Sequence, residues 1–300
     1  MSVPSVEGSG GDQWQEALIL PGHASLLESM VEELAEYLGE DPAVVSDRCA
    51  AAQRLVAEEW ISSGLAKGSD PKSVEQFYSA RRTYLYDLTA FGAQYPNVPE
   101  LEFLARTAAK ARFETYLDFG SGIGSVGIFF ARRGLEVTLA DISPHLLEYA
   151  AWRFRRRGLK VNTIDLRSEK LPENAFQLVT ALDVVEHLAD PRAVVRSIAA
   201  SAKRGGLFAC NVSPAASQYP QHITSYEDIA WGLRAAGFRQ RHVMREVHVF
   251  ERISTSPAMR PLYAGLGYVW FKIARPPVVR MLEALGIKEK LKKLVRGEGS

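Results

Sequence analysis

A glycine-rich turn constrains this chain more than any other feature. Residues 120–127 read GSGIGSVG and connect the apolar run 115–119 to a helical pattern at 124–133. A strand that leads through such a turn into a helix presents backbone amides and a helix N-terminus to a ligand. The glycines fit known spacings in two registers, so the turn by itself leaves two classes of ligand open.

From Glu114 onward, short apolar runs rich in β-branched residues alternate with helical patterns. The predicted strands are 115–119, 136–141, 161–165, 176–183 and 207–212, and the predicted helices are 124–133, 144–157, 191–203 and 225–237. This alternation is typical of β-α-β units in a doubly wound parallel sheet. The stretch 238–253 holds two β-like runs without a helix between them, which predicts an antiparallel pair at the end of this α/β domain.

The remaining chain divides into segments with different patterns. Residues 1–12 are rich in glycine and serine, and we expect them to be disordered. Residues 13–112 carry amphipathic helical patterns, one of which starts at an Asp-Pro pair at Asp41, and precede the α/β domain at 113–257. Residues 258–300 form a tail that ends in a basic amphipathic helix. This helix either docks on the domain or a partner chain, or lies on a membrane surface.

Composition excludes several classes of protein. The chain has 36 basic and 35 acidic side chains and a net charge of +1, so no strong field attracts nucleic acid. Two cysteines, Cys49 and Cys210, are too few for a structural zinc cluster or an iron–sulfur site, and no metal site is expected. The sequence shows no secretory signal and no apolar run of the ~20 residues that span a bilayer, which predicts a cytoplasmic protein without a transmembrane segment.

The basic run 152–160 is another candidate for a nucleic-acid surface. Trp152 and Phe154 predict that this helix packs through its apolar side. The charged positions are then expected on the solvated face of the helix. They are Arg153, Arg156, Arg157 and Lys160.

The two registers of the glycine turn correspond to two cofactors. One register is the G-x-G-x-x-G of a nicotinamide or flavin dinucleotide site, and the other is the D-x-G-x-G-x-G that holds S-adenosylmethionine. Asp141, at the end of the second strand, suits the ribose of either cofactor. Asp118 separates them, because its carboxylate attracts the ammonium of S-adenosylmethionine. Beside a pyrophosphate it is repelled by roughly 1 to 4 kcal/mol at ~4 Å.

Two further acids follow the third and fourth strands. Asp165 is placed to accept a hydrogen bond from an adenine amine, and Asp183 begins the sequence DVVEH at 183–187. Together with the turn, these motifs resemble the class I S-adenosylmethionine-dependent methyltransferases over residues 114–252. The resemblance implies a seven-stranded sheet with an antiparallel last strand and S-adenosylmethionine as cofactor. The cofactor-binding residues that it implies are Asp118, Gly120, Gly122, Gly124, Asp141, Ile142, Asp165, Leu166 and Asp183.

Methyl transfer is an in-line displacement, in which the protein mainly aligns the nucleophile with the methyl group. A base is needed only when the nucleophile keeps its proton. His187 is the first candidate for that base and His222, on the loop after the fifth strand, is the second; Glu186 ranks third. Each histidine has a structural alternative, as a turn cap or a solvated loop residue.

The N-terminal helices are expected to form a lid over the cofactor. The sequence QFYSARRTYLYDL makes Tyr78, Arg81 and Tyr84 candidates for the substrate wall, although an aromatic stripe at helical spacing also suits a core. The sequence after the fourth strand lacks the Asn/Asp-Pro-Pro-aromatic motif of enzymes that methylate amines in DNA. Neither cysteine has the Pro-Cys setting of cytosine methylation.

The sequence therefore predicts methylation of an oxygen or carbon in a small or medium-sized organic acceptor. A cofactor-binding module without turnover, and a membrane-associated enzyme that methylates a quinone or lipid and binds the surface through its tail, stay open as alternatives. A nicotinamide dehydrogenase is the weakest alternative. Assembly into a homo-oligomer also stays open.

Overall fold

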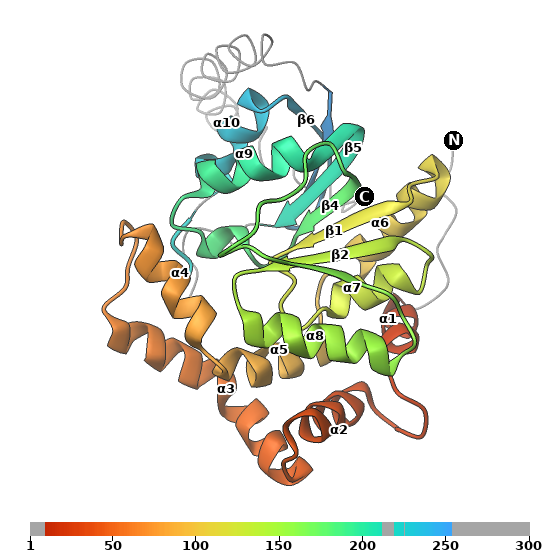
Figure 1. Ribbon diagram of the computed structural model, residues 1–300, viewed down its shortest axis with the longest axis vertical. Helices are drawn as coiled ribbons and strands as arrows, with labels where there is room; N and C mark the ends of the chain where they lie inside the picture. Colours follow the sequence, from red (N-terminus) through yellow and green to blue (C-terminus); the bar gives the residue numbers. More distant parts are fainter. Residues whose placement is uncertain (1–9, 212–218, 225, 254–300) are drawn as a thin grey trace, which may run out of the picture.

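The computed structural model describes residues 10–211, 219–224 and 226–253 (Figure 1). The tail at 258–300, with its predicted helix, and the first nine residues lie outside this range. Within the described residues, no helix has the length and apolar character needed to cross a membrane.

The core of the fold is one seven-stranded sheet with the strand order β3-β2-β1-β4-β5-β7-β6. The strands are β1 Thr115–Phe119, β2 Glu136–Asp141, β3 Asn162–Asp165, β4 Phe176–Ala181, β5 Ala202–Asn211, β6 Phe238–Met244 and β7 Val247–Arg252. Strands β1 to β5 pair in parallel, and β7 is antiparallel to both of its neighbours. The predicted fold class is thereby confirmed. The inserted antiparallel β7 also distinguishes this sheet from the order 3-2-1-4-5-6 of dinucleotide-binding domains.

Helices cover both faces of the sheet because both faces of its central strands are apolar. Successive residues of β1 show this alternation: Tyr116 packs in the core with α7 Ser125–Ala131 and α8 Pro144–Arg156, and Leu117 packs in the core with α9 Pro191–Ser201 and α10 Tyr226–Ala235. The chain order reverses between β1 and β4. In open α/β sheets, ligands bind at the carboxyl ends of the strands beside such a reversal.

The N-terminal segment is helical and packs on α7 and α8 of the α/β domain (Figure 1). Its helices are α1 Gly10–Leu18, α2 Leu26–Leu38, α3 Pro42–Ser63, α4 Pro71–Ala80, α5 Thr83–Ala93 and α6 Val98–Ala111. The predicted cap at Asp41 is present, since its carboxylate accepts a hydrogen bond from the Ala43 amide at 2.8 Å. Helix α1 begins at Gly10, three residues before the boundary expected from the sequence.

The predicted helix through QFYSARRTYLYDL is broken in the structure. Helix α4 ends at Ala80, Arg81 is extended with φ −89° and ψ 111°, and α5 begins at Thr83. The break brings the rings of Tyr78 and Tyr84 to a centroid distance of 5.5 Å. Six residues apart on one continuous helix, these two side chains would lie on different faces.

The prediction of a solvated arginine face on α8 is wrong for two residues. The side chains of Arg153 and Arg157 are 0% and 1% exposed, because α2 packs on this face and supplies Glu33 to both. Arg156 stays on the surface, where it pairs with Glu36.

Candidate functional site

A cavity of about 830 Å³ lies at the carboxyl ends of β1, β2 and β4, closed over by residues of α3, α4 and α5. It brings together eleven of the site residues singled out in the sequence. They are Tyr78, Tyr84, Asp118, Gly120, Gly122, Asp141, Ile142, Asp183, Glu186, His187 and His222. Gly124, Asp165, Leu166 and Arg81 do not line it. Residues of the N-terminal helices thus line the same cavity as the turn, and the role of these helices as a lid stays a prediction.

The three glycines of the turn have two different structural roles. Gly120, Gly122 and Gly124 all have positive φ angles, of 69°, 52° and 74°. A β-carbon on Gly120 would lie 2.5 Å from a methyl of Val184, and one on Gly122 would lie 2.7 Å from a methyl of Leu88 on α5. Gly124 faces the core instead. The first two glycines therefore allow the close approach at the cavity, and the third serves packing.

We expect Gly120→Ala to weaken cofactor binding about tenfold or more, since a left-handed conformation costs an alanine roughly 1–2 kcal/mol and the methyl group meets Val184. Titration calorimetry with S-adenosylhomocysteine measures the effect. Gly134→Ala is the matched control, because Gly134 has φ 86° but nothing within 4 Å of its added β-carbon. Equal affinity of the two variants would show that the close approach at Gly120 is not needed.

Asp118 carries the charge that the cavity presents beside the turn. It is 4% exposed, and its Oδ1 accepts a hydrogen bond from the Thr180 hydroxyl at 3.1 Å. Its Oδ2 has no hydrogen-bond partner among the described residues. Burial raises the pKa of Asp118 to about 7, although hydrogen bonds from Thr180 and Tyr116 lower it. A buried carboxylate oxygen without a donor fits a ligand that brings one, and the ammonium of S-adenosylmethionine is such a donor.

Asp141 holds the turn from the neighbouring strand. Its Oδ2 accepts from the Gly122 amide at 2.9 Å and its Oδ1 from the Ser143 amide at 2.8 Å. Burial raises the pKa of Asp141, and these backbone hydrogen bonds oppose the rise. The carboxylate therefore orders the turn and the start of α8 together, and its contact with ribose hydroxyls stays a prediction.

Asp165 and Leu166 do not line the cavity, and their contacts with adenine stay a prediction. Arg167 donates to both carboxylate oxygens of Asp165, at 2.9 and 2.6 Å, and its hydrogen bond lowers the pKa of that group. The spacing of strand ends correctly placed Asp165 beside Asp141 in the sheet. It did not anticipate that an arginine two residues later would bind the carboxylate. Ile142 and Leu146 line the cavity on this side instead.

Asp183 links two strand ends at the reversal of chain order. It has φ 56°, its amide donates to Oδ1 of Asn211 at 2.6 Å, and Asn211 donates back to its carboxylate. Asn97, before α6, lies 3.5 Å from its other oxygen. Burial raises the pKa of Asp183, and Asn211 lowers it. This geometry fixes the backbone of the DVVEH segment that leads to His187.

The two predicted histidines lie side by side in the cavity wall. Their ring centroids are 4.8 Å apart at an interplanar angle of 82°. The Nδ1 of His187 is 3.0 Å from the Tyr78 hydroxyl and 3.3 Å from the Gln221 carbonyl oxygen. In the Nδ1–H tautomer both partners accept, and Nε2 keeps its lone pair. Burial, with the neighbouring His222, lowers the pKa of His187 to about 3, so its ring is neutral at ordinary pH.

Of the three substrate-binding candidates in the helical segment, two line the cavity and one does not. Tyr78 and Tyr84 line the cavity, and burial raises the pKa of both phenols, so they stay protonated. Arg81 lies over the ring of Phe77, with its Nε 3.9 Å from Glu59, and does not reach the cavity. The rings of Tyr84, Tyr78, His187, His222 and Tyr219 form one continuous row of contacts.

Glu186, His187 and His222 bring one carboxylate and two imidazoles together. Their donor atoms lie within 4.8 Å of one another, and Glu186 is buried. Carboxylate and imidazole are also the ligands of divalent transition metals. The expectation of no metal site therefore stays a prediction, which removal of metal by a chelator tests.

Several cavity residues carry no sequence motif. Asp87 and Leu88 on α5 and Tyr95 before α6 line the cavity together with Tyr219. Burial raises the pKa of Asp87 to about 6. Helical periodicity alone cannot show which of these side chains face a ligand and which face the core. Only Tyr219 could have been identified from the sequence, because it lies in a loop rich in polar and aromatic residues.

Comparisons with known proteins agree with this geometry. Residues 117–208 match the family model of a methyltransferase domain. The chain is 32% identical over 139 residues to the ubiquinone biosynthesis O-methyltransferase of Xanthomonas euvesicatoria pv. vesicatoria, which covers 42% of this chain and 57% of that protein. It is 37% identical over 106 residues to the protein of the same name from Caulobacter vibrioides, covering 34% and 42%. The chain thus spans about half the length of these curated relatives.

A solved structure shares the fold. An O-methyltransferase family protein from Burkholderia thailandensis superimposes with a TM-score of 0.53 over 70% of this chain and 72% of that chain, at 18% identity. Strand order, glycine turn and family match together define a methyltransferase domain of the Rossmann-like class. The motifs, the fold and the family match together support a class I S-adenosylmethionine-dependent methyltransferase domain over residues 117–208, and this family implies S-adenosylmethionine as the cofactor. The dinucleotide register of the turn, and the dehydrogenase that it implied, are not supported.

Proposed function

We propose that this protein transfers a methyl group from S-adenosylmethionine to a hydroxyl oxygen of a small aromatic acceptor. The observation that carries the proposal is the row of rings from Tyr84 to His222, which lines the same cavity as the glycine turn and Asp118. Aromatic walls suit a planar acceptor, since stacked and edge-on ring pairs are favourable. The names of the curated relatives, which are O-methyltransferases, favour oxygen over carbon.

Each group in the cavity has a role in this reaction. S-adenosylmethionine supplies the activated methyl group when bound. Asp118 and the turn hold it in place, and the tyrosines orient the acceptor so that its oxygen lies in line with the methyl group. As the new C–O bond forms, the bond between the methyl group and sulfur would break, and the positive charge would pass to the hydroxyl oxygen, whose proton would become strongly acidic. Nε2 of His187 accepts that proton, and its low pKa suffices because the donor is far more acidic than imidazolium.

Product analysis tests the proposal. The purified full chain is incubated with S-adenosylmethionine and a panel of phenols, catechols and hydroquinones, and products are examined by mass spectrometry. We expect an O-methylated product together with S-adenosylhomocysteine in equal amount. Tight binding of the cofactor without product from any acceptor would instead support a binding module without turnover.

The relatives' names also favour a quinone precursor as acceptor, which would lie in or at a membrane. The basic tail at 258–300 is the segment that we propose for contact with anionic lipid. Flotation with anionic liposomes compares the full chain with a chain that lacks this tail. We expect only the full chain to float, and equal recovery of both would remove the membrane role.

A further inference from the structure

A buried ion cluster joins the N-terminal helix α2 to the glycine turn. Glu33 on α2 and Arg153 on α8 are both 0% exposed, and Nε of Arg153 donates to Glu33 at 2.9 Å. Nη1 of Arg153 donates to the Ile123 carbonyl and to the Ser125 hydroxyl, both at 2.8 Å. One guanidinium therefore holds the two residues that flank Gly124 and is itself held by α2.

A second arginine keeps Glu33 charged and in place. Arg157 donates to both carboxylate oxygens of Glu33 and, at 2.6 Å, to the carbonyl of Leu18, the last residue of α1. Burial alone would raise the pKa of Glu33, but the attraction of Arg153 and the hydrogen bond from Arg157 outweigh it and lower the pKa. A bidentate carboxylate between two arginines is a rigid arrangement, because the planar guanidinium fixes its direction.

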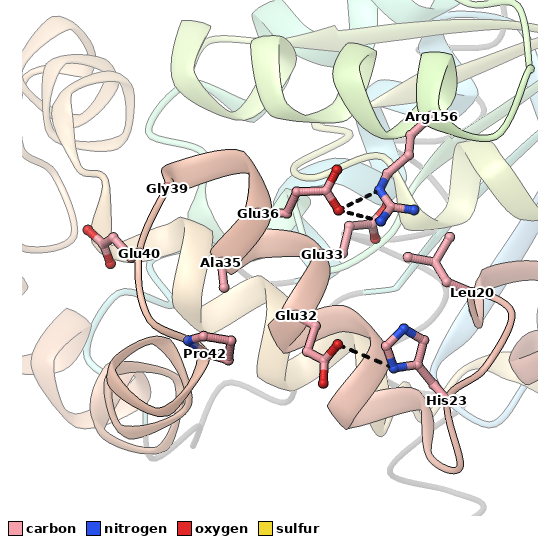
Figure 2. A pocket seen from close by; sticks show the side chains of 10 residues that line it. All are labelled: Leu20, His23, Glu32, Glu33, Ala35, Glu36, Gly39, Glu40, Pro42 and Arg156. Atoms are coloured by element: carbon pink, nitrogen blue, oxygen red, sulfur yellow. Dashed lines mark hydrogen bonds and ion pairs between the residues drawn. The ribbon is translucent and has the colours of Figure 1, made fainter.

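Helices α2 and α8 are also joined by an ion pair on the surface, but this pair is not connected to the glycine turn. Figure 2 shows Glu36 paired with Arg156, with Glu33 beside them, at a hollow of about 340 Å³. The side chain of Glu36 is 54% exposed, and among the described residues neither member of this pair is hydrogen-bonded to the turn. Both pairs join α2 to α8, but only the buried one continues to the turn.

The position of the turn matters because the cofactor is bound by its backbone. Ile123 and Ser125 line the cavity and flank Gly124, directly after Gly120 and Gly122. A turn with three glycines at positive φ has many other conformations available when it is unsupported. Ordering a flexible turn on binding costs conformational entropy. A turn that already has its binding conformation avoids this cost, so the cofactor binds more tightly.

We propose that Glu33 and Arg153 are positioning residues that hold the glycine turn in its cofactor-binding form, so that the N-terminal helical segment sets cofactor affinity. The proposal rests on the cofactor site of the proposed function and not on the acceptor. No residue of α2 lines the cavity. A substitution in α2 should nevertheless change cofactor affinity, because it acts through the glycine turn.

The test compares Glu33→Gln and Arg153→Lys with Glu36→Gln as the matched surface control, all in the full chain. Calorimetry with S-adenosylhomocysteine should show about tenfold weaker binding for the first two, as expected for loss of a charged hydrogen bond. The control should bind as the natural protein does. With a methyl acceptor in hand, KM for the cofactor should rise while kcat at saturation stays within about twofold, because the reacting groups are unchanged.

Hydrogen exchange of residues 120–126 in the ligand-free protein gives a second measurement. We expect faster exchange in Glu33→Gln and Arg153→Lys than in Glu36→Gln. If the two buried variants unfold at lower urea but keep the affinity and the exchange of the control, the cluster serves stability alone and the proposal is wrong. Should Glu33→Gln not fold, Glu33→Asp and Arg153→Lys provide the same comparison. Since binding is measured without turnover, failure to find an acceptor leaves this result unaffected.

Discussion

Replacing Asp118 by asparagine should weaken S-adenosylmethionine binding on the order of a hundredfold, since truncating one partner of a buried charge pair costs about 2–5 kcal/mol. The cause is the Asp118 carboxylate, which lines the cavity and whose Oδ2 has no hydrogen-bond partner among the described residues. Asparagine keeps the shape and the contact with Thr180 but loses the charge that the ammonium requires. Calorimetry measures the change, and Glu36→Gln on the exposed surface of α2 should bind normally.

The same variant should be more stable than the natural protein when no cofactor is present. Burial raises the pKa of Asp118 from 3.8 to about 7, so the folded state holds the proton more tightly than the unfolded state. This contribution to stability is complete below pH 3.8 and is lost as the pH rises to about 7. Above that pH the ionised carboxylate destabilises the fold, and asparagine removes the penalty. Urea unfolding at pH 8 should therefore show a higher midpoint for Asp118→Asn.

Cofactor affinity should follow the titration of Asp118. Only the ionised carboxylate attracts the ammonium, so binding at pH 6 should be about tenfold weaker than at pH 8. Asp118→Asn should show no such dependence. If the variant binds as tightly as the natural protein at both pH values, the ammonium lies elsewhere and the assigned orientation of the cofactor is wrong.

Replacing His187 by alanine should lower kcat about a hundredfold, the lower end of what a positioned base contributes. Cofactor affinity should be unchanged, because the turn and Asp118 are untouched. Tyr78→Phe is the matched variant: it removes the hydroxyl at 3.0 Å from Nδ1 but leaves the base, so it should cost only a few-fold. Stopped assays that quantify the methylated product measure both.

The pH profile tests whether the ring of His187 is neutral in the working enzyme. Because its pKa is lowered to about 3, the ring is already neutral at pH 5, and kcat should show no histidine inflection between pH 5 and 8. Dialysis against a chelator is the control, since Glu186 and His222 offer metal ligands beside it. If His187→Ala keeps full activity after dialysis, His187 is not the base. If the natural protein loses its activity on dialysis, Glu186, His187 and His222 bind a metal ion instead.

The α/β half of this protein could be predicted closely because its signals are local. Strands β1 and β2 begin and end where the apolar runs do, and the turn follows from glycine spacing alone. Asp118 and Asp141 were singled out because each lies at the end of a strand beside the glycine turn. The strand ends also placed Asp165 beside Asp141, but the sequence pattern did not indicate that Arg167 would bind the Asp165 carboxylate. The helical half was less predictable, as the break at Arg81 shows.

The sequence by itself determined where the glycine turn and its neighbouring acids lie, because a turn and acids at strand ends need only the right spacing along the chain. Only the tertiary structure decided which side chains line the cavity beside them. Tyr78, His187 and His222 come from three separate segments, and nothing in their local patterns requires them to meet. Tertiary packing likewise buried Arg153 and Arg157 against Glu33, because the packing of one helix on another depends on complementary surfaces far apart in the chain.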